Sequence, residues 1–415
     1  MRHLLAAMLV LLVGITDPLR ATAEPAPSPG QGAETGSDLS LDEALRILWA
    51  QARTHIDRGE PRAALPLLTA LVARAPHVPL FRSALADALA ATGQTDRARY
   101  HYDLLRGAMR SDRDQAALDR RIDALERRQK PWSGHLFVGV VPASNPGRRT
   151  DLTTVTIAGL PFQLRDTARS GVGVELRGGL AWEPWLRDDL RGHLGVSVDA
   201  ELYGSGIADD ITLRGDARIT AFGDRAQQLS FGIFAKRRWR GGEKWSDSLG
   251  AEIGLSRRVG ESTLLSGRLI HETEQLSRGR AAVHRNTAEL RARHIVSPQF
   301  QLRGTLRGEW RDSSNPFLSG FRSTLRGGGA YTFEGGLRVG LDITREINRF
   351  DGVNPVFGVR QRNNVWRGEV TLNHAEVSLM GFSPVVKLDL TRQRSTIPTS
   401  SFTNRALSLG LTRQF

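Results

Sequence analysis

From residue 134 onward, apolar and polar side chains alternate at a period of two, which predicts strands with one apolar and one polar face. In 172–177, Val, Val and Leu alternate with Gly, Glu and Arg, and 249–255 and 339–344 repeat the pattern. The polar face carries Arg, Asp and Glu at regular intervals together with frequent Gly, which favours a closed barrel over a soluble sandwich. A strand in a bilayer needs every backbone group paired, so a sheet of such strands must close on itself.

The number of strands follows from the length of this region. Segments of roughly 10–15 residues have the length of tilted membrane strands, and roughly fifteen of them fit into 134–415. Single-chain bacterial barrels have an even number of strands, so one segment does not belong to the wall. We expect the outlier to be 153–164, because long polar connections flank it. The predicted barrel domain therefore spans 131–415 and has 14 strands, at about 20 residues for each strand with its loop.

Aromatic residues and the last strand support this prediction. Seven of the eight Trp residues fall within 131–415, several at segment ends, where interfacial aromatic girdles belong. In the last segment Leu407, Leu409 and Leu411 alternate with small or polar residues, and the chain ends on Phe415. A final amphipathic strand of this kind resembles the signal read by the barrel-assembly machinery. We expect Leu411 and Phe415 to carry that signal.

The first residues predict export. Arg2 and His3 precede an apolar stretch at 4–15, and Ala21-Thr22-Ala23 supplies a small-x-small cleavage site. The sequence thus predicts a secretory signal peptide over 1–23, whose apolar part is shorter than the roughly 20 residues that a spanning helix needs. Residues 24–38, with several Pro, Gly and Ser, are expected to form a flexible leader. The lack of Cys is compatible with the oxidising periplasm and excludes an acylated N-terminal Cys.

A repeat of 34 residues organises the region between the leader and the barrel. Its paired positions are Ala52 and Ala86, Gly59 and Gly93, Ala64 and Ala98, and Leu68 and Tyr102. Small residues where two helices cross, with Gly at the turn between them, are typical of tetratricopeptide repeats. Because two repeats bury little surface, a capping helix is expected at 116–125. The sequence therefore predicts a helical domain over 39–130, followed by a transmembrane antiparallel β-barrel.

Such helix pairs stack into a concave surface that holds an extended segment of another polypeptide. Trp49 and Arg53 in the first repeat, and Ser83 and Asp87 in the second, occupy the inward positions. We expect these four residues to contact a cargo polypeptide. The alternative is that Trp49 packs against the leader or the barrel.

The positive charge of the chain is concentrated in the barrel. Residues 131–415 hold 39 Arg and Lys against 28 Asp and Glu, whereas 24–130 hold 16 against 15. An exported protein rarely meets nucleic acid, so that partner is not expected. The expected partners are lipid A phosphates around the outer rim or an acidic polypeptide inside the lumen. The alternative is a solvated positive surface without a partner.

The sequence contains no recognisable catalytic, cofactor-binding or metal-binding motif. His271-Glu272 begins like a zinc motif, but Gln275 stands where the second His is required. The glycines at 171, 173 and 178 belong to a strand rather than to a dinucleotide loop. We therefore expect no cofactor and no enzymatic activity.

Three stretches resemble a known family. They are GHLFVGVVPASNPGRRT (134–150), GLPFQL (159–164), and GFSPVVKLDLTRQRS (381–395) with the closing NRALSLGLTRQF. They are similar to segments of the surface lipoprotein assembly modulators, or Slam proteins, of the type XI secretion system, which join a short tetratricopeptide domain to a C-terminal barrel. The family commonly reads Asp-Ser-Asn followed by further Asn, where this chain has Ala143-Ser144-Asn145-Pro146-Gly147.

The resemblance implies an outer-membrane modulator that captures cargo in the periplasm and promotes its translocation to the cell surface. The implied cargo is a surface lipoprotein or a soluble haem- or metal-acquisition protein, with Ser144 and Asn145 as further candidate contacts. Outer-membrane lipids, including lipopolysaccharide, and the barrel-assembly machinery are further expected partners of a monomeric barrel. Two alternatives stay open: an exopolysaccharide exporter, although that class carries many more repeats, and a passive porin, although porins have no reason to carry a periplasmic helical domain.

Overall fold

The structure is a computed structural model of the 415-residue chain. It describes residues 41–106, 131–157, 159–204, 209–223, 227–260, 262–277, 281–297, 299–333, 336–374, 377 and 381–414, together with 114, 117–119, 121, 122 and 125. The signal peptide predicted at 1–23, the leader at 24–38 and the terminal Phe415 lie outside the described residues.

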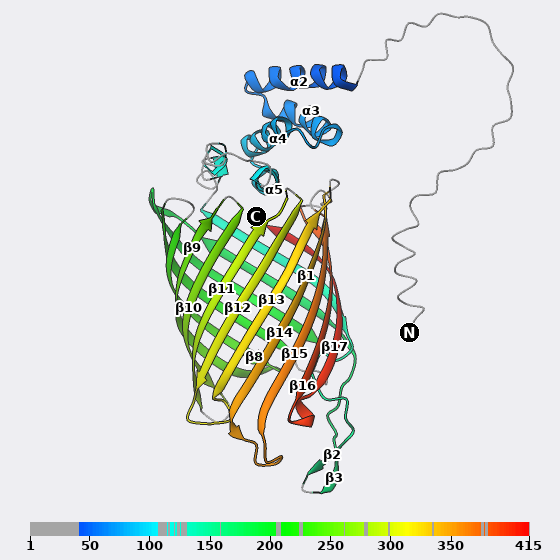
Figure 1. Cartoon of the computed structure of the whole chain (residues 1–415), viewed down its shortest axis with the longest axis vertical. Helices are drawn as coiled ribbons and strands as arrows, with labels where there is room; N and C mark the ends of the chain where they lie inside the picture. Colours follow the sequence, from blue (N-terminus) through cyan, green and yellow to red (C-terminus); the bar gives the residue numbers. More distant parts are fainter. Residues whose placement is uncertain are drawn as a thin grey trace, which may run out of the picture. The chain divides into compact units, whose positions relative to one another are not determined.

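The helical domain begins with two helix pairs, labelled in Figure 1. They are α2 (Leu41–Asp57) with α3 (Pro61–Arg74), and α4 (Pro79–Ala91) with α5 (Thr95–Arg106). The turn within each pair passes through a glycine in the left-handed region, Gly59 at φ 73° and Gly93 at φ 79°. A side chain at these positions would strain the backbone, which explains why glycine recurs at the 34-residue spacing. Pro61 and Pro79 each open a helix, where a missing N–H group costs nothing.

The core of the helical domain includes the residues that the repeat predicted. Ala52, Ala64, Ala86 and Ala98 are fully buried, because each stands where two helix axes approach too closely for a larger side chain. Leu68 and Tyr102 are buried at the equivalent position of each repeat. Leu118, Ile122 and Leu125 belong to the same cluster, so the third, capping element is confirmed at the positions described there.

The barrel wall is one antiparallel sheet. Its strands are β1 (Trp132–Ala143), β4 (Gly171–Trp182), β6 (Leu190–Tyr203), β7 (Asp210–Phe222), β8 (Gln228–Arg240), β9 (Glu243–Val259), β10 (Thr263–Leu276), β11 (Ala282–Ile295), β12 (Phe300–Asp312), β13 (Gly320–Thr332), β14 (Leu337–Val353), β15 (Arg360–His374), β16 (Ser383–Ser395) and β17 (Phe402–Gln414). From β6 to β17 each strand pairs with its sequence neighbours, and β1 joins β4 to β17, which closes the ring (Figure 1). The short β5 (Trp185–Arg187) pairs with β6 beyond the end of β4. The predicted fold of 14 wall strands is confirmed.

The segment expected to stand outside the wall does so. It folds as a separate hairpin of β2 (Thr154–Ile157) and β3 (Leu160–Gln163), which has no partner in the wall sheet. The hairpin belongs to the long connection between β1 and β4. Short η1 (Pro398–Ser400) lies in the connection between β16 and β17, at the same end of the barrel.

Side chains alternate across the wall as the period of two predicted. Val138 and Val140 on β1, and Leu409 and Leu411 on β17, are exposed on the outside. Phe137 and Gly139 on β1, and Ser408 and Gly410 on β17, lie at the intervening positions and face the lumen. An apolar outer face is exposed in the isolated chain because lipid covers it in a bilayer.

The seam between β1 and β17 closes the barrel. Paired residues run from His135 with Gln414 to Val140 with Leu409 and resume at Ala143 with Ala406. Pro142, which has no N–H to donate, lies in this gap. On the lumen side the Phe137 ring covers Gly410, where an added Cβ would lie 2.5 Å from the ring and 2.7 Å from the Val138 carbonyl oxygen.

We therefore predict that Gly410→Ala destabilises the closed barrel by about 1–3 kcal/mol, because the methyl group overpacks the seam. The matched control is Gly340→Ala on β14, which also faces the lumen but whose added Cβ would meet nothing closer than 3.7 Å. The measurement is the temperature at which the folded, fast-migrating form is lost in unboiled gel electrophoresis. Equal behaviour of the two variants would show that the seam tolerates the extra group.

Candidate functional site

Trp49, the first predicted groove residue, packs inside the helical domain. Its ring lies 5.3 Å from the ring of Phe81, centroid to centroid, which joins α2 to α4. Trp49 is half-buried and contacts the hydrophobic core. The contact therefore gives Trp49 a structural role, and its contact with cargo stays a prediction.

The other three groove residues are more polar and more open. Arg53 is exposed and lies 3.8 Å from Asp57, one turn along α2. On α4, Ser83 and Asp87 both accept hydrogen bonds from Arg121 Nη1, at 2.6 and 3.0 Å. Arg121 belongs to the capping element, so this contact ties the second repeat to its cap. Helical spacing places Ser83 and Asp87 one turn apart, as expected. Their shared partner Arg121 was not expected, because it lies 38 and 34 residues further along the chain.

Asp87 also accepts a hydrogen bond of 2.6 Å from the Tyr102 hydroxyl. Burial and this hydrogen bond raise the pKa of Tyr102 above its ordinary value. Tyr102 therefore stays protonated and keeps donating to Asp87. The arrangement holds one acceptor of the predicted groove in a fixed orientation.

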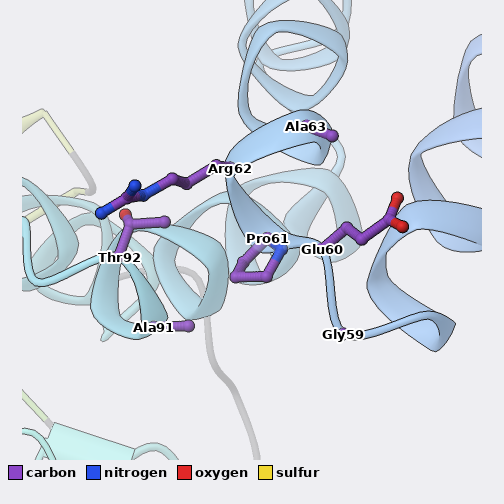
Figure 2. Close-up of a pocket in the computed structure, with 7 residues that line it drawn as sticks. All are labelled: Gly59, Glu60, Pro61, Arg62, Ala63, Ala91 and Thr92. Carbon is purple, nitrogen blue, oxygen red and sulfur yellow. The ribbon is translucent and has the colours of Figure 1, made fainter.

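A shallow pocket lies at the helix turns. Figure 2 shows its lining, which consists of Gly59, Glu60, Pro61, Arg62, Ala63, Ala91 and Thr92. None of the four predicted groove residues belongs to this lining. The pocket is built from the turn between α2 and α3 and from the end of α4, so it is separate from the predicted groove.

Among the described residues, a buried histidine of the helical domain has a ring nitrogen without a hydrogen bond. His101 on α5 is buried, and its Nδ1 has no hydrogen-bond partner in the described part of the chain. Burial, with smaller contributions from Arg82 and Arg97, lowers its pKa to about 3. Neutral His101 is therefore the form that the folded domain accepts.

Ser144 and Asn145 lie where β1 ends. Ser144 N–H donates to the Arg405 carbonyl at 2.9 Å, and Arg405 N–H donates back to Ser144 Oγ at 2.9 Å. Asn145 N–H donates to Asn404 Oδ1 at 2.9 Å, which adds a third bond to the first residues of β17. Beyond the gap at Pro142, these two residues connect the first and last wall strands.

Both the nitrogen and the oxygen of the Asn145 side-chain amide form hydrogen bonds. Its Nδ2 donates to the carbonyls of Arg149 and Thr403 at 2.7 and 3.1 Å, and its Oδ1 accepts from Arg149 N–H at 3.0 Å. Asn145 is 1% exposed. We call Ser144 and Asn145 the latch, because their hydrogen bonds join β1 to β17. The contact of these two residues with cargo stays a prediction.

The lumen wall carries a network of ion pairs. Glu252 on β9 has three arginines around it, with nitrogen-to-oxygen distances of 3.8 Å to Arg214, 3.9 Å to Arg218 and 3.6 Å to Arg268. Glu309 on β12 lies 3.1 Å from Arg307 and 3.7 Å from Arg322. Arg307 lies on the same strand as Glu309, whereas the other partners come from different strands, so strand register brings them together.

A second cluster lies on the neighbouring strands. Asp342 on β14 pairs with Arg303 and, at 3.2 Å, with Arg326. Arg326 also reaches Glu369 on β15 at 3.5 Å. Arg, Asp and Glu were expected on the lumen face from the alternation, but the partner of each residue depends on contacts between strands.

The insertion signal is described only in part. Leu411 faces outward from β17 and is exposed, as expected of a lipid-facing residue. Phe415 lies outside the described residues. The reading of these two residues by the assembly machinery stays a prediction.

Within the described ranges, no group of three or more His, Asp or Glu is placed to hold a metal ion. In the same ranges, no helix is long and apolar enough to cross a bilayer.

Comparison with known sequences gives two matches. The sequence profile of the surface lipoprotein assembly modifier family matches residues 132–415, which include every wall strand. A tetratricopeptide repeat profile matches residues 55–122. A search of the curated proteins gives no match.

Solved structures similar to the chain include three outer-membrane or transport proteins. The outer membrane channel DcaP of Acinetobacter baumannii is 10% identical over 68% of this chain and 96% of its own, with a TM-score of 0.44. A FadL homologue of Pseudomonas aeruginosa is 10% identical over 71% of this chain and 92% of its own, with a TM-score of 0.42. The P. putida toluene transporter TodX has the same identity and coverage, with a TM-score of 0.41. Similarity at this level establishes no shared function.

The hydrogen bonds of the latch can be tested by substitution of Asn145. We expect Asn145→Ala to destabilise the barrel by about 1–3 kcal/mol, because it leaves buried backbone groups without partners. Asn145→Asp should also destabilise it, since a carboxylate would then face two carbonyl oxygens. The control is Asn364→Ala on β15, whose side chain accepts a 3.4 Å bond from Arg345. Unboiled gel electrophoresis measures the folded fraction, and a latch role is excluded if all three variants match the parent protein.

The pKa of His101 generates a second prediction. The unfolded chain binds a proton near pH 6.5 but the folded domain only near pH 3, so stability is complete above pH 6.5 and falls as the pH drops. Each pH unit below 6.5 should cost up to about 1.4 kcal/mol. The measurement is thermal loss of helicity by circular dichroism at about pH 7 and about pH 4.5.

His101→Leu should flatten this pH dependence, whereas His77→Gln, at an exposed position, should preserve it. If His101→Leu keeps the full acid sensitivity, another group is responsible.

Proposed function

This chain belongs to the surface lipoprotein assembly modifier family, and on that basis we propose that it captures one secreted protein in the periplasm and promotes its delivery to the cell surface. It is an outer-membrane β-barrel with N-terminal tetratricopeptide repeats.

The observation that carries the proposal is the extent of the family match. It covers the barrel from β1 to the end of the chain, including the Ser144-Asn145 latch and the β2–β3 hairpin. The family description names surface lipoproteins, so a lipoprotein is the cargo class that we propose first. A soluble haem- or metal-acquisition protein is the second cargo class.

The helical domain supports capture. Tetratricopeptide pairs present a concave surface to an extended polypeptide, and this chain keeps the buried alanines and turn glycines that build such pairs. Chain connectivity places the domain directly before β1, so it would lie on the periplasmic side, where exported cargo arrives. Arg53 is the most exposed of the four proposed contact residues.

The test is co-expression with each small secreted protein encoded beside this chain, scored by protease accessibility on intact cells. We expect one neighbour to reach the surface only when the full-length protein is present. Deletion of 39–130 should abolish its exposure while the barrel stays folded and heat-modifiable. The proposal fails if every neighbour reaches the surface equally well without the protein. Loss of solute uptake in that case would favour a passive porin, and loss of surface polysaccharide would favour an exporter.

Within the helical domain, we predict that Arg53→Glu reduces cargo exposure severalfold, because it reverses charge on the proposed contact face. The matched control is Arg74→Glu at the end of α3, which is also exposed but lies outside the predicted groove. Equal loss with both variants, measured by the same protease assay, would argue against a specific contact at Arg53.

A further inference from the structure

Many ion pairs of the lumen are asymmetric in depth. The Glu309 side chain is 4% exposed, whereas its partner Arg307 is 39% exposed. Asp342 and Arg326 are 2% and 43% exposed, and Glu289 and Arg291 are 5% and 54% exposed. The carboxylate therefore lies against the wall in each pair, and the guanidinium faces the water of the lumen.

Side-chain length explains the asymmetry. An Asp or Glu carboxylate stays close to the backbone of its strand, whereas an Arg side chain extends several bonds further before its charge begins. A guanidinium has five N–H groups, and pairing with one carboxylate uses at most two of them. The remaining N–H groups are available to a molecule inside the barrel.

A buried carboxylate beside a more exposed cation recurs around a large part of the barrel wall. Further pairs with a buried carboxylate and a more exposed Arg or Lys include Glu175 with Arg177, Glu252 with Arg268, Glu272 with Lys236 and Asp342 with Arg303. Most of these residues stand on β8–β14, which lie across the closed ring from the β1–β17 seam. At the seam the inward residues are uncharged, including Phe137, Val141 and Ser408.

This arrangement gives the lumen a positive inner surface even where each ion pair is neutral. An ion in the lumen approaches the positive end of each pair more closely than the negative end. Walls of low dielectric then concentrate the field inside the barrel, and rings of Arg are how other pores select anions.

We propose that the lumen is an anion-binding channel that accepts carboxylate-rich stretches of polypeptide in preference to basic ones. This proposal names acidic polypeptide as the ligand of the lumen, and it rests on the proposed function for the identity of the natural cargo. The charge preference itself rests only on the geometry of the lumen. The two parts can therefore fail separately.

The first test measures ion selectivity of the purified full-length protein in planar bilayers under a potassium chloride gradient. We expect chloride to be preferred over potassium. The triple variant Arg291→Gln, Arg307→Gln and Arg326→Gln should lower this preference severalfold. Each substitution leaves its buried carboxylate another cation, since Glu289 keeps Arg268, Glu309 keeps Arg322 and Asp342 keeps Arg303.

The matched control replaces three arginines whose positions face outward: Arg257→Gln, Arg349→Gln and Arg405→Gln. It removes the same formal charge from the protein without changing the lumen. Unchanged selectivity in the control, with a loss in the lumen variant, supports the proposal. A preference for potassium in the parent protein, or equal loss in both triple variants, overturns it.

The second test is independent of conduction. Fluorescent poly-glutamate and poly-lysine are titrated into the full-length protein in detergent, with anisotropy as the readout. We expect poly-glutamate to bind more tightly, with affinity that falls in salt and in the lumen variant but not in the control. Tighter binding of poly-lysine overturns the proposal.

The cargo assay separates the two proposals. If the lumen variant loses selectivity and also delivers less cargo, the lumen is the route for an acidic segment. If it loses selectivity but delivers cargo as the parent does, the polypeptide part of this inference is wrong and the proposed function stands. If no neighbour requires the protein at all, the proposed function fails, while the charge preference is judged by the first two tests alone.

Discussion

Complete pairing of backbone hydrogen-bonding groups is the constraint on which the rest of this structure depends. A bilayer interior provides no water to satisfy an open sheet edge, so β1 must meet β17. Pro142 interrupts the ladder between these strands, and the Ser144-Asn145 latch supplies bonds to β17 just beyond the interruption. Ser144 and Asn145 thus lie just beyond the gap in the ladder, where their amide and hydroxyl groups join β1 to β17.

Closure also determines where charge can be placed. Once the outer face is committed to lipid, Arg, Lys, Asp and Glu in the middle of the spanning strands are favoured on the lumen side. A carboxylate held against the wall loses most of its water and requires a cation, which explains the several arginines around Glu252 and Glu309. The arginines retain water because their side chains are long enough to reach it. The positive lumen is therefore a consequence of side-chain length on an inward-facing strand.

In the helical domain, packing depends on small residues at a few fixed positions. Alanines at the helix crossings let the pairs approach, and left-handed glycines turn the chain between them. The bonds from Arg121 to Ser83 and Asp87 then fasten the capping element to the second repeat. A rigid stack of this kind suits the presentation of a surface to an extended polypeptide.

Local periodicity determined much of the architecture from the sequence alone. The period of two and the length of the region were sufficient to predict 14 wall strands, because membrane strands have a narrow range of lengths. They also led to the prediction that 153–164 lies outside the wall. The 34-residue spacing was sufficient for the buried alanines and the turn glycines, because each repeat places them in the same environment. Only the tertiary structure decided which side chains meet. Asn145 bonds to residues of β17 that lie 258 and 259 positions away, Trp49 packs on Phe81, and Glu252 lies beside arginines of two other strands, β7 and β10. Such contacts depend on the register between strands and on helix crossing, and neither is encoded in the spacing of residues along one segment.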